Sequence, residues 1–205
     1  MNYLAHLYLS DAHPESLIGS LMGDFVKGGI GDEHPYRVRE AIRLHRRIDS
    51  FTDAHDTVLR SRRRIGAPYR RYAGILIDVF YDHFLACDWA AYSPVPLDHF
   101  ARRVYHVMSL HQQGFPPRMQ RSTAYMIGTD LLVSYRDIEG IRTALRGIEG
   151  RLRRPSQLGL AIAELESNYA QLHADFSEFF PALMQFVADS DEHPVAAGTG
   201  RRLVR

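Results

Sequence analysis

The sequence predicts an all-α protein with a single domain, a bundle of about eight helices. Apolar residues recur at the spacing of amphipathic helices over most of the 205 residues, and no segment alternates like a strand. A chain of this length can bury one substantial core. We therefore expect one helical domain over residues 1–188. Residues 189–205 mix acids, Pro, Gly and Arg with almost nothing to bury, which predicts a flexible tail.

Local start and stop signals set the expected helices in order. Proline suits the first turn at Pro14, the stretch KGGIGDEHP is a loop, and Thr52 or Asp53 can cap the helix that follows. The segments SPVP and GFPP break the second half of the chain. The expected helices span residues 3–10, 14–26, 36–51, 53–66, 69–89, 97–111, 117–135, 138–152 and 156–188.

Two of these helices carry ionisable residues on faces that are otherwise apolar. In LHRRIDSFTDAH, His45 and Asp49 are four residues apart, so both share the face that carries Val38, Ile42 and Ile48. Burying an ionised group without a partner costs several kcal/mol, so another group must neutralise the pair. A metal ion would do so.

The second of these helices, ILIDVFYDHFLACDW, is apolar nearly all round, which is typical of a central, buried helix. Asp78 and Asp82 are again four residues apart, and His83 lies beside them. Such acids repel one another unless they are protonated, paired or bound to a cation. Buried Asp side chains also cap helices or pair with Arg, and the chain has 24 Arg against a single Lys, so a structural role for either pair stays open.

Four further residues lie near these pairs in the expected fold. Asp24, in GDFVKG, has the setting of a site edge, with Lys27 just beyond it. His6 interrupts the first apolar helix and equally suits a hydrogen-bonded core histidine. Asp53 equally suits a helix cap, and His55 a surface residue.

Carboxylate and imidazole donors narrow the chemistry. No CxxC motif is present, which argues against a structural zinc site, and mixed oxygen and nitrogen donors suit manganese, iron or magnesium with open water positions. Such an ion is typical of phosphoester hydrolysis. The sequence contains neither a GxSxG elbow nor a P-loop. Its lone cysteine, Cys87, is expected in the core of a protein from a reducing compartment.

Charge and hydropathy limit the partners. A net charge of +1 gives no bulk attraction to nucleic acid, and no apolar run is long enough for a membrane-spanning helix. The N-terminal apolar run lacks a basic region before it, so we expect a cytoplasmic protein without a signal peptide. Residues 37–71 contain eleven Arg and four acids, which indicates either a surface for an acidic partner or a solvated helix face.

The segments MNYLAHLYLS, GDFVKG, LHRRIDSFTDAH and ILIDVFYDHFLACDW, in this order, closely resemble the acyl carrier protein phosphodiesterases over the first 90 residues. The resemblance implies a divergent, HD-like member of the helical metal phosphohydrolases. It implies removal of 4'-phosphopantetheine from the serine of holo-acyl carrier protein, with Mn²⁺ as the usual metal and Mg²⁺ or Fe²⁺ as alternatives. The sequence lacks a consecutive His-Asp dyad, so our ligand assignment rests on helix geometry.

Together these observations assign expected roles. The expected metal ligands are Asp24, His45, Asp49 and Asp78. Asp82 and His83 are expected to orient or deprotonate the attacking water. His6 is expected either to support a ligand or to protonate the leaving serine oxygen. Carrier proteins are acidic, so basic side chains would orient the substrate. The residues expected to bind its phosphate or its acidic surface are Lys27, Arg46, Arg47, Arg60, Arg63 and Arg64.

Two alternatives remain open at this stage. A related HD-type phosphohydrolase that acts on a nucleotide or another small phosphodiester would use the same ligands without the basic surface. A non-catalytic helical adaptor for an acidic partner would keep the arginines and tolerate loss of Asp78.

Overall fold

The computed structural model describes residues 2–152 and 156–192, and every regular element in these ranges is helical. The predicted all-α class is confirmed. The described residues form twelve α-helices, of which α1, α6, α9 and α11 have six residues or fewer. None of the helices in the described ranges combines the length and apolar composition needed to cross a membrane.

The first helices follow the predicted order. They are α1 (Tyr3–Tyr8), α2 (Pro14–Met22), α3 (Tyr36–Ala54), α4 (Asp56–Arg64), α5 (Ala73–Cys87) and α6 (Trp89–Tyr92). Helix α3 meets α4 at His55, and α5 ends at Cys87, before the predicted end at residue 89. The remaining helices are α7 (Leu97–His111), α8 (Pro117–Gly128), α9 (Leu131–Ser134), α10 (Ile138–Glu149), α11 (Ile162–Ser167) and α12 (Tyr169–Glu192).

Two predicted helices are interrupted in the structure. Asp130 adopts a left-handed conformation, with φ of 46°, and separates α8 from α9 within the predicted segment 117–135. Asn168 leaves helical geometry between α11 and α12, and its side chain donates to the carbonyl of Glu164 at 3.0 Å. Helix α12 then continues to Glu192, beyond the predicted end at residue 188. Residues 193–205 of the predicted tail lie outside the described residues.

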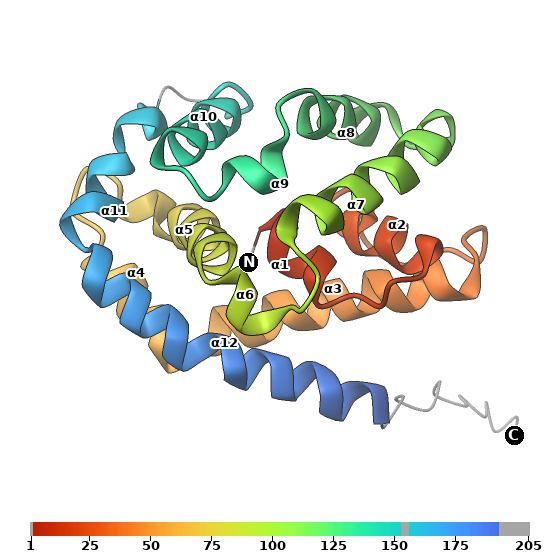
Figure 1. The fold of residues 1–205 in the computed structure, drawn as a ribbon, viewed down its shortest axis with the longest axis horizontal. Helices are drawn as coiled ribbons and strands as arrows, with labels where there is room; N and C mark the ends of the chain where they lie inside the picture. The colour runs from red at the N-terminus through yellow and green to blue at the C-terminus, as the bar shows by residue number, and fades with distance from the viewer. Residues whose placement is uncertain (1, 153–155, 193–205) are drawn as a thin grey trace, which may run out of the picture.

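Helix α5 forms the centre of the molecule, as its all-round apolar sequence predicts. The side chains of Phe80, Tyr81 and Phe84 are fully buried. Figure 1 shows α1 in the middle of the molecule, next to α5. The C-terminal end of α12 lies at the edge. A short, buried N-terminal helix is thus placed where its side chains can meet those of the surrounding helices.

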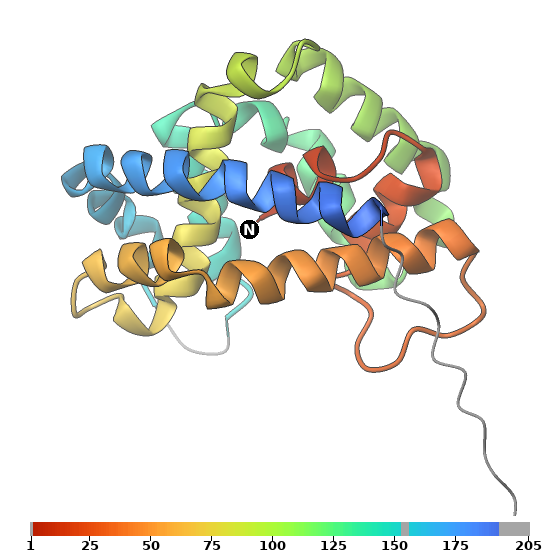
Figure 2. The same cartoon turned by 90° about the horizontal axis from the view of Figure 1, so that it is seen from below.

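The long helix α3 packs against α2 on one side and against α12 on another. Figure 2 shows α3 and α12 as two long helices side by side. The approach of α2 depends on Gly19, because a Cβ there would lie 2.4 Å from the carbonyl oxygen of Val38. This close contact brings the C-terminal end of α2 next to the middle of α3.

Candidate metal centre and the adjoining cavity

Helix α1 is anchored at its N-terminus by a carboxylate from α5. The backbone N–H groups of Leu4 and Ala5 donate to Asp82 at 2.8 and 3.2 Å, whereas the local N-cap residue, Asn2, makes no side-chain cap bond. A carboxylate is favourable there because the first N–H groups of a helix lack partners within the helix. Burial raises the pKa of Asp82 to about 7, although these N–H groups lower it. Asp82 therefore fixes the helix that carries His6.

The described residues contain one group whose ligand atoms suit a metal ion: His6 of α1 with His45 and Asp49 of α3. These atoms lie within 4.8 Å of one another. The Nε2 atoms of His6 and His45 lie 3.0 and 3.3 Å from the two oxygens of Asp49. A second carboxylate, Asp24, lies 3.6 Å from Nε2 of His45. Both imidazoles are buried, and the two carboxylates face more open space.

The orientation of His45 is set by its surroundings on α2. Its Nδ1 lies 2.8 Å from the carbonyl of Ser20, which can only accept, so Nδ1 carries a proton. A Cβ at Gly23 would lie 2.3 Å from Cγ of His45, so the ring lies directly against this glycine. The Nε2 atom is consequently directed at the carboxylates of Asp49 and Asp24.

The electrostatics of the two histidines differ sharply. Burial lowers the pKa of His6 to about 4, which makes its imidazole neutral at pH 7. Burial also lowers the pKa of His45, but hydrogen bonds to Asp24 and Asp49 outweigh it and raise this pKa to about 9. Burial raises the pKa of Asp49, yet the two histidines hold it well below its ordinary value. The pKa of Asp24 is likewise lowered by His45, against the effect of burial.

These contacts fit a divalent cation. With Nδ1 of His45 donating to Ser20, a neutral ring would direct the Nε2 lone pair at two carboxylates, which is unfavourable unless a proton or a metal ion lies between them. The backbone carbonyl at Nδ1 is the partner that metal-binding histidines commonly have. Nδ1 of His6 is buried without a hydrogen-bond partner among the described residues. Two imidazoles and two carboxylates match the mixed donors expected from the sequence.

The expected convergence of Asp78 with His45 and Asp49 is not found. Asp78 does not belong to the group of ligand atoms that includes His45 and Asp49. It lies half-buried one turn before Asp82 on α5, and its charge raises the pKa of Asp82. The polar face of α5 thus contacts the N-terminal end of α1. It affects the metal centre only indirectly, through the position of His6 on α1.

His83, expected to act on the attacking water, is hydrogen-bonded elsewhere. Its Nδ1 donates to the carbonyl of Tyr135 at 2.8 Å. In this tautomer Nε2 is an acceptor, and it accepts from the hydroxyl of Tyr169, which lies 3.0 Å from it. Both ring nitrogens are therefore used within this contact. The prediction that Cys87 is buried is wrong: it is exposed at the end of α5, where the helix reaches the surface, with Sγ 3.7 Å from Nε2 of His83.

Asp24 also lines a cavity of about 650 Å³ between α8, α10 and the segment after α2. Lys27 lines the same cavity, and its contact with phosphate stays a prediction. Sequence reasoning did not identify the three arginines of this wall, Arg118, Arg121 and Arg151. A helical face in PRMQRSTAYMIG, with polar residues at 118, 121, 122 and 125, is the signal that could have indicated them.

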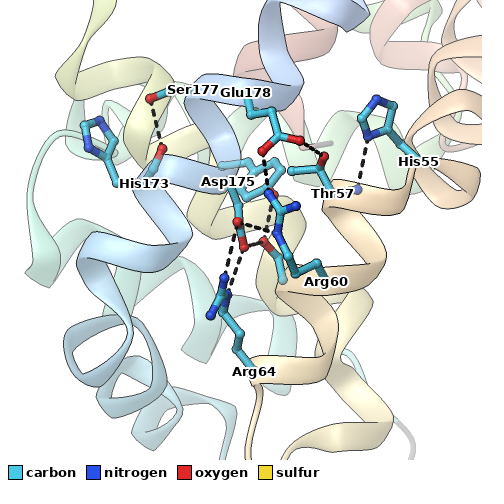
Figure 3. A network of polar contacts seen from close by, with 10 residues as sticks. His55, Thr57, Arg60, Arg64, His173, Asp175, Ser177 and Glu178 are labelled. Atoms are coloured by element: carbon cyan, nitrogen blue, oxygen red, sulfur yellow. Dashed lines mark hydrogen bonds and ion pairs between the residues drawn. The ribbon is translucent and has the colours of Figure 1, made fainter.

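Two arginines of the expected carrier surface are engaged in an internal network, which Figure 3 shows from close by. Asp175 of α12 accepts from Arg60 at 2.8 Å, from Arg64 at 2.9 Å, and from the hydroxyl of Ser61. Arg60 also pairs with Glu178 at 2.6 Å. These side chains from α4 therefore hold α12, because Asp175 is only 2 % exposed and needs these donors.

The other arginines of that surface differ in their contacts. Arg46 donates to two backbone carbonyls of the segment after α2, at 2.8 and 2.9 Å. Arg47 donates to Ser190 and lies over the ring of Phe186, 5.4 Å from its centroid. Arg63 is exposed. A role for these side chains in binding the carrier stays a prediction.

In this all-helical domain two imidazoles and two carboxylates meet beside a basic cavity, and three of these four side chains could hold a metal ion, an arrangement compatible with an enzyme that hydrolyses phosphate esters. Residues 1–183 match the family of acyl carrier protein phosphodiesterases. The chain belongs to this family.

Curated relatives match nearly the whole chain. The acyl carrier protein phosphodiesterase of Photorhabdus laumondii is 34 % identical over 192 residues, which cover 93 % of this chain and 97 % of the relative. That of Serratia proteamaculans is 36 % identical over 190 residues, 92 % of this chain and 98 % of the relative. That of Klebsiella pneumoniae is 36 % identical over 186 residues, 90 % of this chain and 96 % of the relative. No solved structure matches significantly, and the relation to HD phosphohydrolases stays a prediction.

Proposed function

We propose that this protein is a divalent-metal-dependent phosphodiesterase that removes 4'-phosphopantetheine from the serine of holo-acyl carrier protein and leaves apo-carrier protein. The family name and the full-length relatives support the phosphodiesterase activity and its carrier substrate. The observation that carries the chemistry is the group formed by His6, His45 and Asp49. The two alternatives from the sequence lack an observation that favours them.

In this proposal the ion is held by His45, Asp49, Asp24 and His6. Of the two roles expected for His6, support of the ligands and protonation of the leaving serine oxygen, the first is favoured, because Nε2 lies 3.0 Å from Asp49 and the ring stacks on His45. Oxygen and nitrogen donors favour Mn²⁺, with Mg²⁺ or Fe²⁺ as alternatives. When bound, the ion supplies Lewis-acid polarisation of the phosphodiester and a nucleophile from water at neutral pH.

The protein's own residues supply the positioning. The Ser20 carbonyl holds the proton of His45 on Nδ1 and so leaves Nε2 for the ion. Asp82 fixes α1 and with it His6. Lys27, on the cavity wall with Asp24, would meet a non-bridging phosphate oxygen. Asp78 and His83 are given no direct part in this scheme.

The test is to incubate the purified protein with holo-acyl carrier protein and Mn²⁺, and to weigh the carrier by mass spectrometry. We expect loss of the phosphopantetheine mass, and no loss with EDTA or with Asp49→Asn. An unchanged carrier, with Mn²⁺ occupancy established in the same sample, would refute the function. A panel of nucleotides and small phosphodiesters in parallel reactions would then test the alternative substrate class.

A further inference from the structure

We propose that the cavity between α8, α10 and the segment after α2 binds the 4'-phosphopantetheine arm of the carrier, with Arg118, Arg121 and Arg151 as its polar contacts. This inference rests on the proposed function and names the subsite that the substrate's arm would occupy. The position of the cavity supports it, since Asp24 is both part of its wall and 3.6 Å from Nε2 of His45. A group in the cavity is therefore adjacent to the metal centre.

The charges on the cavity wall favour an anionic ligand. Three arginines and Lys27 line the cavity with one carboxylate, Asp24. Within the described ranges no carboxylate lies within 4.0 Å of Arg118, Arg121 or Arg151, a marked contrast with the paired arginines of α4. Arg151 donates to the backbone carbonyl of Gly147 at 3.1 Å. Clustered cations without a carboxylate partner repel one another, and a phosphate group would relieve this repulsion with charge-assisted hydrogen bonds.

Both helices direct one continuous face at the cavity. Arg118, Arg121 and Tyr125 lie on α8 at the spacing of successive turns, and on α10 Ala144 lies one turn before Gly147 and Ile148 on the cavity wall. Gly147 leaves room for Tyr125, whose hydroxyl would lie 3.2 Å from a Cβ at position 147. The glycine thus lets an aromatic side chain form part of the wall.

The metal-proximal end of the cavity is also polar. The pKa of Tyr3, on the wall, is raised by burial and then by the charge of Asp24, while hydrogen bonds from Arg151 and Ser122 lower it. Tyr3 is therefore within electrostatic reach of both Asp24 at the metal centre and Arg151 of the cavity. A phosphate bound between Asp24 and Arg151 would have cations on one side and the metal centre on the other.

The chemistry of the arm matches this wall. It carries a phosphate at one end, followed by a branched hydrocarbon, a hydroxyl and two amides. Arginine donors suit the phosphate and amide oxygens, and Leu131 and Ile148 suit the hydrocarbon. A volume of about 650 Å³ lies inside the range of roughly 300 to 1,000 Å³ that is usual for small-molecule sites.

The test is calorimetric titration of the Mn²⁺-loaded protein with 4'-phosphopantetheine, and with pantetheine as the phosphate-free probe. The double variant R118A/R121A should bind 4'-phosphopantetheine at least about tenfold more weakly, because charge-assisted hydrogen bonds are lost. G147L adds bulk and keeps every charge, so it should weaken both probes. The matched control is R102A, which removes an exposed arginine of α7 that does not line the cavity.

Two results would overturn the inference. One is unchanged binding of 4'-phosphopantetheine by both R118A/R121A and G147L. The other is that R118A/R121A loses as much affinity for apo-carrier protein as for holo-carrier protein, which would assign the arginines to the carrier's acidic surface. Failure of the proposed function is distinguishable, because it would leave the carrier mass unchanged whatever the probes bind. All variants are compared after circular dichroism confirms wild-type helix content.

Discussion

The imidazole rings of His6 and His45 are stacked, with centroids 3.8 Å apart and planes inclined by 15°. They come from α1 and α3, and their Nε2 atoms approach opposite oxygens of one carboxylate, Asp49. Two stacked imidazolium ions would repel each other, and each ring's charge disfavours charge on the other. Without a metal, the stack therefore carries a single positive charge, on His45, and His6 is neutral.

Asp49 touches both rings, so its charge should be essential for the ion. Asp49→Asn should weaken Mn²⁺ binding by more than the roughly 10- to 100-fold that loss of an outer-shell partner costs, and should abolish turnover. Electron paramagnetic resonance of free Mn²⁺ measures the affinity. Asp53→Asn, one turn further along α3 and paired with Arg62 on the surface, is the control that should keep both properties. Wild-type Mn²⁺ affinity in Asp49→Asn would contradict the ligand assignment.

Gly23 should be required for the position of His45. In Gly23→Ala the new Cβ would lie 2.3 Å from Cγ of the His45 ring, so the ring must shift. We expect a fall in Mn²⁺ affinity of about tenfold or more, because displacement of an oriented ligand acts like loss of its supporting partner. Gly29→Ala is a matched control, since a Cβ there meets no atom within 4 Å. Equal Mn²⁺ affinity in the two variants would show that the ring tolerates the change.

Asp82 should act on the metal centre through the position of α1. Asp82→Ala removes the acceptor of two buried N–H groups, at a cost of about 1 to 3 kcal/mol for each group left without a partner. Urea unfolding measures this loss, and Mn²⁺ titration of the folded variant measures the effect on His6. Asp82→Asn, which keeps one acceptor oxygen, should recover part of the stability and part of the Mn²⁺ affinity. A folded Asp82→Ala protein with unchanged Mn²⁺ affinity would limit Asp82 to a structural role.

The network between α4 and α12 should contribute strongly to stability. Asp175→Ala leaves Arg60 and Arg64 without their shared acceptor and should lower the free energy of unfolding by about 3 kcal/mol. Both arginines are partly exposed and can be hydrated again, so the loss should lie at the lower end of the range usual for breaking a buried ion pair. Glu178→Ala removes an exposed partner of Arg60 and the acceptor of the Thr57 hydroxyl, and should lower stability by less than Asp175→Ala does. Urea unfolding measures both variants, and equal free energies of unfolding for the two would contradict the prediction.

The same carboxylate should make stability depend on acid pH. Burial raises the pKa of Asp175, but hydrogen bonds from Arg64, Ser61 and Arg60 outweigh it and lower this pKa below the ordinary 3.8. A lowered carboxyl pKa contributes stability that is complete above 3.8 and is lost as the pH falls through the folded-state value. The stability advantage of the wild type over Asp175→Asn should therefore shrink from pH 7 to pH 3. A stability difference between the two proteins that stays constant from pH 7 to pH 3 would contradict the lowered pKa of Asp175.

The outcome for the two polar pairs shows how far helix periodicity reaches. The spacing of His45 and Asp49 predicts that both side chains share a buried face and need a partner, and the structure places them beside His6. The same pattern at Asp78 and Asp82 predicts the same need, but there Asp82 is satisfied by the backbone of α1. Periodicity identifies a buried charge that must be neutralised. It does not say whether the neutralising group is a metal ion, a histidine or a helix N-terminus.

The arginines likewise show which properties follow from the sequence and which depend on the tertiary structure. Their number in residues 37–71 is plain from the sequence, but Arg60 and Arg64 contact Asp175, more than a hundred residues away. Three arginines at the cavity come instead from the second half of the chain, where sequence reasoning assigned no site residue. Their grouping depends on how α8 and α10 pack, which the composition of either helix does not encode.

By itself the sequence determined the all-α class, the central place of α5, the pairing of His45 with Asp49 and the family resemblance over the first 90 residues. These properties follow from local spacing, because a helix fixes which neighbours share a face. The tertiary structure alone decided that His6 joins His45, that Asp82 anchors α1, and that a basic cavity adjoins Asp24. These depend on contacts between distant segments, and such contacts are set by the packing of the whole core.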